Sequence, residues 1–323
     1  NLSFFPVRLR TQIYNEIINA EKKTISTSDN LEIYLVRTFG PTLFEQFFKP
    51  FLTKYYRRNL SDLVHSMDKG SIPVPSKRDV TEGLRGKKFK NLGYNPEFYY
   101  PKQSLRHLIA NYSESVRSDI RFNSEAIRID VRQKTIESGE NLYQYRHLVN
   151  TMPLKTFLQR ADHFDIDADQ IERMQHISTV VANVVLERRR RRFHWVYLPD
   201  ERFPYYRFGY YPGGDQICGY LERTVMEPAP LDSDAEMHQI TKILKNIGVI
   251  KSEVEVKYIS LKYIPVSYIL FNRHWRQVVP PVLRRLKEAG IYSIGRYGAW
   301  DYSSMSEDIE KAKLTAEALN HEN

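Results

Sequence analysis

Apolar residues recur at helical spacing along several stretches of the chain. Between residues 38 and 56 they lie three or four positions apart, which predicts one core-facing helix with a kink at Pro50. Ser28 and Asp29 are typical of the N-cap of a shorter helix that precedes it. Other helices are predicted at 104–116, 155–161, 234–247 and 278–289, and from Ser303–Ser304 to Leu319.

Alternating or β-branched runs predict the strands. Residues 179–187, with the sequence TVVANVVLE, are strongly β-branched, and Ile127, Ile129 and Val131 alternate with charged residues. Other strands are predicted at 147–153, 195–197, 205–210, 217–222, 254–261 and 291–294. Strands therefore gather in the middle of the chain, with helices before and after them. This order predicts an α+β fold with a mixed or antiparallel sheet and few strand–helix–strand units.

Residues 66–94 interrupt these patterns. They are polar and basic and contain several Pro and Gly residues, which predicts a long surface excursion.

The composition narrows the classes of function. The chain has 323 residues, which is enough for one large domain or two unequal ones. Its net charge of +9 favours an anionic partner, which could be a phosphate ligand, a nucleic acid or an acidic membrane. A single cysteine, Cys218, excludes an intramolecular disulfide and a cysteine-based zinc site. No signal peptide and no run of about 18 apolar residues is visible, so we expect a soluble, cytoplasmic protein.

Several motifs with known chemistry can be set aside. The nine histidines form no HxH or HExxH pair, which argues against a metal site. Asp165–Asp169 begins like a calcium loop, but Gln170 replaces the required Gly and His176 the final Glu. The five arginines Arg188–Arg192 predict a solvated hairpin end more than a nucleic-acid contact. No GxSxG, P-loop or GxGxxG sequence occurs.

The segment from Gly290 to Leu319 is the most informative. A short apolar strand enters a glycine turn, and a helix then begins at Ser303–Ser304–Met305. Free N–H groups at such a helix start form a site for an anion or a carbonyl oxygen. Gly295 and Gly298 would let a planar ligand approach the backbone, and Arg296 could grip a phosphate. A simple chain reversal would have the same spacing.

This segment resembles the C-terminal flavin motif of the UDP-galactopyranose mutase family and related amine-oxidase-like flavoproteins. The similarity lies in Gly295–Arg296 and the following WDYSSM at 300–305. Six further stretches resemble the family in the same order: Phe5–Pro6, 39–56, Tyr100–Lys102, Leu148–Leu154, Phe203–Arg207 and Ile264–Val266. The family's N-terminal dinucleotide-binding unit is missing from this sequence, which begins like the middle of a domain, so we expect residues upstream of Asn1.

The resemblance implies four segments and a set of site residues. Residues 1–103 would be a helical substrate or cap region, 104–160 part of an FAD-binding domain, 161–275 an antiparallel-sheet substrate domain, and 276–323 a C-terminal FAD-binding segment. FAD would contact Gly295, Arg296, Gly298, Ser304 and Met305. Substrate would contact Tyr56, Arg207, Arg296 and Tyr302. The resemblance assigns no catalytic side chain and no metal.

The function implied is that of an FAD-dependent enzyme acting on a sugar nucleotide or a similar small anionic substrate. Two alternatives remain open. One is an FAD-dependent oxidoreductase of the amine-oxidase type, which is favoured by the loss of family substrate residues, such as the Trp replaced by Tyr56. The other is a non-catalytic binding protein on the same fold. A nucleic-acid partner is disfavoured.

Overall fold

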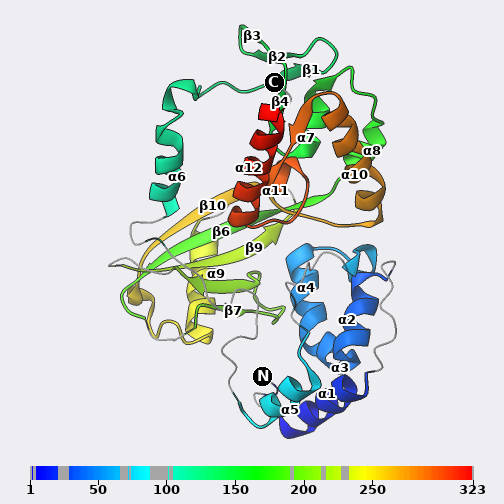
Figure 1. Ribbon diagram of the computed structural model, residues 1–323. Coiled ribbons are helices and arrows are strands. Elements are labelled where there is room, and N and C mark those ends of the chain that lie inside the picture. Colours follow the sequence, from blue (N-terminus) through cyan, green and yellow to red (C-terminus); the bar gives the residue numbers. More distant parts are fainter. Residues whose placement is uncertain are drawn as a thin grey trace. The chain divides into compact units, whose positions relative to one another are not determined.

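The computed structural model (Figure 1) divides the chain into two compact units. Unit 1 comprises Asn1–Lys102 and Ile177–Ser267, and unit 2 comprises Gln103–His176 and Tyr268–Asn323. The structure describes residues 2, 5–20, 29–65, 72, 74–87, 101, 105–189, 193–211, 216–226 and 233–321. The unit boundaries fall within two long strands, so each of these strands contributes to both units. The four-segment division implied by the sequence stays a prediction.

The N-terminal part of unit 1 is helical. Its elements are α1 (Val7–Asn19), α2 (Leu31–Phe39), α3 (Pro41–Leu43), the π-helical turn Phe44–Phe48, α4 (Lys49–Tyr56), the 3₁₀ turn Leu60–Asp62 and α5 (Lys77–Leu84). The predicted helix over 38–56 is confirmed for 41–56, where α3, the π turn and α4 follow one another without a break, but its start and its uniform α geometry were wrong. Gly40, at φ +83°, separates α2 from α3, and the π turn precedes Pro50. Pro50 has no N–H for the helical ladder, and widening of the preceding turn accommodates this loss.

The start of α2 also differs from the sequence interpretation. Its N-cap is Asn30, whose side chain accepts a hydrogen bond from the Ile33 amide at 2.8 Å. Asp29 instead pairs with Arg37, and Ser28 lies outside the described residues. The excursion at 66–94 contains α5, which the sequence analysis missed. Ser76 and Asp79 cap this helix reciprocally, a local signal that the polar composition obscured.

A five-stranded antiparallel sheet forms the rest of unit 1. Its order is β10 (Val256–Ile269), β6 (His176–Leu186), β9 (Ile217–Val225), β8 (Arg207–Tyr210) and β7 (Trp195–Tyr197). Helix α9 (Ser233–Asn246) covers one face, where its Ile240, Ile243 and Leu244 are buried against inward-facing strand residues such as Phe208. Tyr205 donates a hydrogen bond to Glu236 of α9, and burial raises the pKa of this phenol. The other face of the sheet is free of α9.

Unit 2 is built on two small sheets. The order of one is β3 (Asn141–Gln144), β2 (Thr135–Ser138), β1 (Arg128–Asp130) and β5 (Ala161–Asp162), with β1 and β5 parallel. The other pairs β4 (Leu148–Asn150) with β11 (Ile291–Ser293) in parallel. The helices are α6 (Leu105–Glu114), α7 (Leu154–Arg160), α8 (Ala168–Glu172), α10 (Arg273–Glu288), α11 (Gly295–Gly298) and α12 (Met305–His321).

These sheets and helices confirm the predicted α+β class with a mixed sheet. Among the described residues, no helix is long and apolar enough to span a bilayer.

Candidate functional site

The glycine turn predicted from the sequence lies in unit 2, directly after β11. Gly295 has a φ of +77°, and no atom of the described residues lies within 4 Å of the position that a Cβ would occupy there. Gly298 differs, because a Cβ at this position would lie 2.6 Å from the carbonyl oxygen of Asn150 in β4. The absence of a side chain at Gly298 thus lets the turn pack on the neighbouring strand. Of the two glycines, only Gly295 leaves open space for a ligand.

Arg296 holds the turn together. Its Nε and Nη2 atoms donate hydrogen bonds to the carbonyl oxygen of Ser303, at 2.9 and 2.5 Å. Its guanidinium carbon lies 4.7 Å from the ring centroid of Tyr302, a cation–π contact. The Tyr302 ring also stacks on Tyr268, with the ring centroids 6.2 Å apart. The structure therefore brings the predicted residues Arg296 and Tyr302 together. The contact of Arg296 with a phosphate stays a prediction.

Trp300 anchors the middle of the turn. Its side chain is fully buried, and its backbone adopts a φ of +49°, a conformation that costs a non-glycine residue energy. The indole N–H of Trp275 donates to the Trp300 carbonyl oxygen at 2.7 Å. The ring of His176 packs edge-on against Trp300, and burial lowers the pKa of this histidine. The strained backbone is thus fixed by the contacts of Trp300 with Trp275 and His176.

The start of α12 follows the turn. Ser304 and Glu307 cap this helix reciprocally, because the Ser304 amide donates to the Glu307 carboxylate at 2.6 Å and the Ser304 hydroxyl accepts from the Glu307 amide. Asp308 accepts a hydrogen bond from the hydroxyl of Ser303 at 2.6 Å. Two carboxylates therefore already lie at this helix end. They favour a neutral carbonyl oxygen over a phosphate as a partner for the remaining amides, which include that of the half-exposed Met305.

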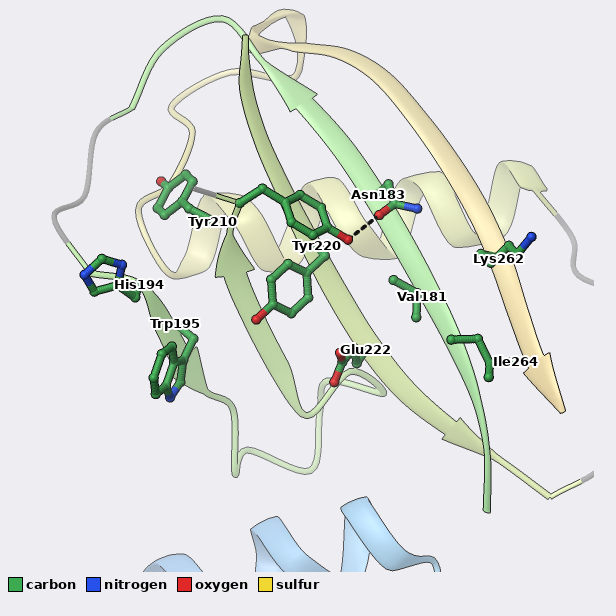
Figure 2. Close-up of a pocket in the computed structure, with 10 residues that line it drawn as sticks. Val181, Asn183, His194, Trp195, Tyr210, Tyr220, Glu222, Lys262 and Ile264 are labelled. Atoms are coloured by element: carbon green, nitrogen blue, oxygen red, sulfur yellow. Dashed lines mark hydrogen bonds between the residues drawn. The ribbon is translucent and has the colours of Figure 1, made fainter. Parts of the chain in front are cut away.

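A second candidate site lies in unit 1, on the sheet face opposite α9 (Figure 2). The strand pairing places Asn183, Tyr220, Gly209 and Trp195 in one row across β6, β9, β8 and β7. The next row contains Val181, Glu222, Arg207 and Tyr197. An open cavity of about 550 Å³ lies over this face, lined by Val181, Asn183, His194, Trp195, Tyr210, Tyr211, Tyr220, Glu222, Lys262 and Ile264.

Gly209 shapes the floor of this cavity. A Cβ at Gly209 would lie 2.5 Å from Cζ of Tyr220, so the Tyr220 ring lies directly over the glycine. Tyr211, which directly follows β8, donates a hydrogen bond from its hydroxyl to Oδ1 of Asn183 at 2.8 Å. The result is an aromatic surface across the sheet with one carboxamide at its edge.

Arg207, predicted to bind substrate, is paired at the edge of this cavity. Its Nη2 donates to Oε2 of Glu222 at 2.5 Å, and the Tyr206 hydroxyl donates to the same oxygen at 2.9 Å. The guanidinium also lies 5.7 Å from the Tyr220 ring. Glu222 therefore offsets the charge of Arg207.

Tyr56, the other predicted substrate residue of unit 1, ends α4. The centroid of its ring lies 4.6 Å from that of Tyr55, and the Tyr55 ring centroid lies 4.9 Å from that of Tyr206. Lys54 fastens the same helix by donating to the carbonyl oxygens of Leu198 and Asp200 at 2.7 and 2.6 Å. Burial lowers the pKa of Lys54 to about 8.

The predicted residues thus fall into two groups. Tyr56 and Arg207 belong to unit 1, whereas Gly295, Arg296, Gly298, Tyr302, Ser304 and Met305 belong to unit 2. Sequence reasoning missed Asn183, Trp195, Tyr220, Glu222 and Lys262. Strand alternation around the buried Leu221 could have placed Tyr220 and Glu222 on the polar face. Tyr100, Lys102 and Arg190–Arg192 lie outside the described residues.

No protein-family model and no curated protein matches the chain. Solved structures do share its fold. A crystal structure of reduced UDP-galactopyranose mutase aligns with a TM-score of 0.83 and 18% identity, over 94% of this chain and 70% of that one. A putative protoporphyrinogen oxidase from Exiguobacterium sp. 255-15 aligns with a TM-score of 0.74 and 13% identity, over 99% and 73% of the chains. A putrescine oxidase variant aligns with a TM-score of 0.65 and 8% identity, over 99% and 77%.

These identities are low enough that the alignments establish the fold alone. They confirm the resemblance read from the sequence motifs: the chain has the fold that UDP-galactopyranose mutase shares with protoporphyrinogen oxidase and putrescine oxidase.

Proposed function

We propose that the protein is an FAD-dependent enzyme acting on a small anionic substrate. The observation that carries this proposal is the turn after β11, in a chain with this fold. Gly295 is open to a ligand, Arg296 and Trp300 fix the turn, and α12 begins directly after it.

The residues of this turn fit a flavin. A planar ring could approach the backbone at Gly295, where no side chain intervenes. The first amides of α12, beginning at Met305, would donate to a ring carbonyl oxygen, because Glu307 and Asp308 disfavour a phosphate there. FAD would supply the redox or nucleophilic chemistry, and the protein would supply orientation and charge.

Within this proposal, the residues predicted to contact a sugar nucleotide stay Tyr56 and Arg207 in unit 1, and Arg296 and Tyr302 in unit 2. An FAD-dependent oxidoreductase of the amine-oxidase type is the second candidate. The pairing of Arg207 with Glu222 favours it, because an arginine already neutralised by a carboxylate binds a phosphate less strongly.

The test begins with the absorption spectrum of the protein, expressed with the residues that we expect upstream of Asn1, after incubation with FAD and removal of free cofactor. Visible flavin bands in the wild type, and their loss in Gly295→Val, are expected, since a branched side chain would fill the open position. Gly139→Val, which changes an equally open turn between β2 and β3, is the matched control and should retain flavin. Absence of bound flavin in the wild type would contradict the proposal and leave the non-catalytic alternative.

A second assay separates the two enzyme classes. A mutase-like enzyme, once its flavin is reduced, would isomerise a UDP-sugar without consuming oxygen. An oxidase would instead reduce its flavin with an organic substrate and pass the electrons to an acceptor.

A further inference from the structure

The cavity on the sheet of unit 1 has a chemical character that the predicted substrate residues do not use. Its floor is aromatic, because Tyr220 lies over Gly209 and Trp195 stands next to it in the same row. Val181 and Ile264 add an apolar side. Aromatic walls of this kind favour a flat ring, which gains stacking and burial of its faces.

The polar groups of the cavity favour an anion. Lys262, on β10, has neither a carboxylate nor a hydrogen-bond partner among the described residues. Asn183 uses its Oδ1 atom to accept from Tyr211, which leaves its amide nitrogen as a donor. Figure 2 shows this nitrogen turned toward the strand that carries Lys262, whose own ammonium points away from Asn183 in the same view. Both residues therefore lie on one side of the aromatic floor, and the exposed Lys262 side chain has to turn toward Asn183 to share a ligand with it.

Glu222, the one carboxylate among the described residues that line the cavity, does not oppose an anion. Glu222 accepts hydrogen bonds from Arg207 at 2.5 Å and from Tyr206 at 2.9 Å, so its charge is offset locally. The positive charge of Lys262 is therefore not balanced by a carboxylate among the described residues that line the cavity. One ammonium and one carboxamide match a singly charged group, whereas a diphosphate requires more cationic donors.

From these observations we infer that the cavity binds a flat ring that carries one carboxylate. Tyr220 holds the ring, and Lys262 and the amide of Asn183 hold the carboxylate. This inference names the substrate class of the proposed enzyme and rests on that proposal for the cavity's role in catalysis. The binding itself depends only on the residues of the sheet.

Calorimetric titration of the FAD-incubated protein tests the inference with three probes of the same shape: 2-naphthoate, 2-naphthylmethanol and 2-naphthylmethylamine. We expect 2-naphthoate to bind about tenfold more tightly than the neutral alcohol, because of one charge-assisted hydrogen bond at an exposed site. The cationic amine should bind most weakly. Equal affinity for all three probes would overturn the inference.

Variants assign the preference to particular side chains. Lys262→Met should abolish the preference for 2-naphthoate and leave the affinity for 2-naphthylmethanol unchanged. Lys257→Met is the matched control, because Lys257 lies on the same strand and pairs with Glu187 at 3.4 Å. Gly209→Ala should weaken all three probes by displacing the Tyr220 ring, and Tyr220→Leu should do the same without a backbone change. Identical effects of the two lysine variants would contradict the assignment.

UDP serves as the competing probe. If UDP binds more tightly than 2-naphthoate and Lys262→Met leaves its affinity unchanged, the carboxylate class is wrong and the sugar-nucleotide substrate is favoured. Binding of 2-naphthoate by a protein that takes up no FAD would overturn the proposed function but not this site. Uptake of FAD without any discrimination among the naphthyl probes would overturn the site but not the proposed function.

Discussion

Replacing Arg296 by alanine should destabilise unit 2 as well as weaken its ligand. Arg296→Ala removes two N–H donors from the Ser303 carbonyl oxygen and the cation–π contact with Tyr302. A hydrogen bond from a charged donor contributes about 1.5–3 kcal/mol, and a partly exposed cation–π contact about 0.5–1 kcal/mol. We therefore expect the free energy of unfolding to fall by about 2–4 kcal/mol. Arg296→Lys should recover only part of this loss, because its ammonium presents one nitrogen where the guanidinium presents two, and it has no planar face to lie over Tyr302.

The assay exploits the placement of the tryptophans. Trp275 and Trp300 lie in unit 2 and Trp195 lies in unit 1, so in a Trp195→Phe background urea unfolding followed by fluorescence reports on unit 2. Arg106→Ala, at an exposed position of α6, is the control and should change stability by less than about 0.5 kcal/mol. An equally small change in the free energy of unfolding for Arg296→Ala would refute the role of Arg296 in stabilising the turn. If that variant nevertheless lost its ligand, Arg296 would act on the ligand alone.

Two further predictions concern packing and pH. Gly298→Ala should lower the free energy of unfolding of unit 2 by about 1–3 kcal/mol, because the new Cβ would meet the Asn150 carbonyl oxygen at 2.6 Å. Gly139→Asn, at an open turn with a φ of +59°, is the control and should leave that free energy nearly unchanged. Equal losses for the two variants in urea unfolding would contradict this account. The lowered pKa of Lys54, about 8, means that the unfolded chain binds more protons from about pH 8 to 10.5, so this group's contribution to stability rises with pH over that range. Lys54→Met should remove that rise in the urea unfolding of unit 1, and parallel pH profiles for wild type and variant would count against a buried Lys54.

Much of the local structure was predictable because its signals are local. The β-branched run at 179–187 forms most of β6, and the apolar spacing at 234–247 forms α9 with Ile240, Ile243 and Leu244 inward. Gly290, at φ +81°, follows the end of α10, and Gly295 begins the turn after β11. Each of these features is set by backbone preferences or side-chain periodicity within a few residues.

The failures show where local signals compete. Pro50 could be recognised as a break in a helix, but whether the chain responds with a kink or a π turn depends on the surrounding packing. Asn30 and Asp29 are both good capping residues. The pairing of Asp29 with Arg37 and the hydrogen bond from Ile33 to Asn30 decide between them.

The sequence by itself determined the α+β class, most elements, and the turn and helix that resemble a flavin motif. Only the tertiary structure decided which residues form a site. The register of four strands places Asn183, Tyr220, Gly209 and Trp195 in one row, and folding alone gives Arg207 its partner Glu222. The reason is physical: helices, strands and turns follow from interactions between near neighbours in the chain, whereas register and charge pairing follow from packing between segments that the sequence separates.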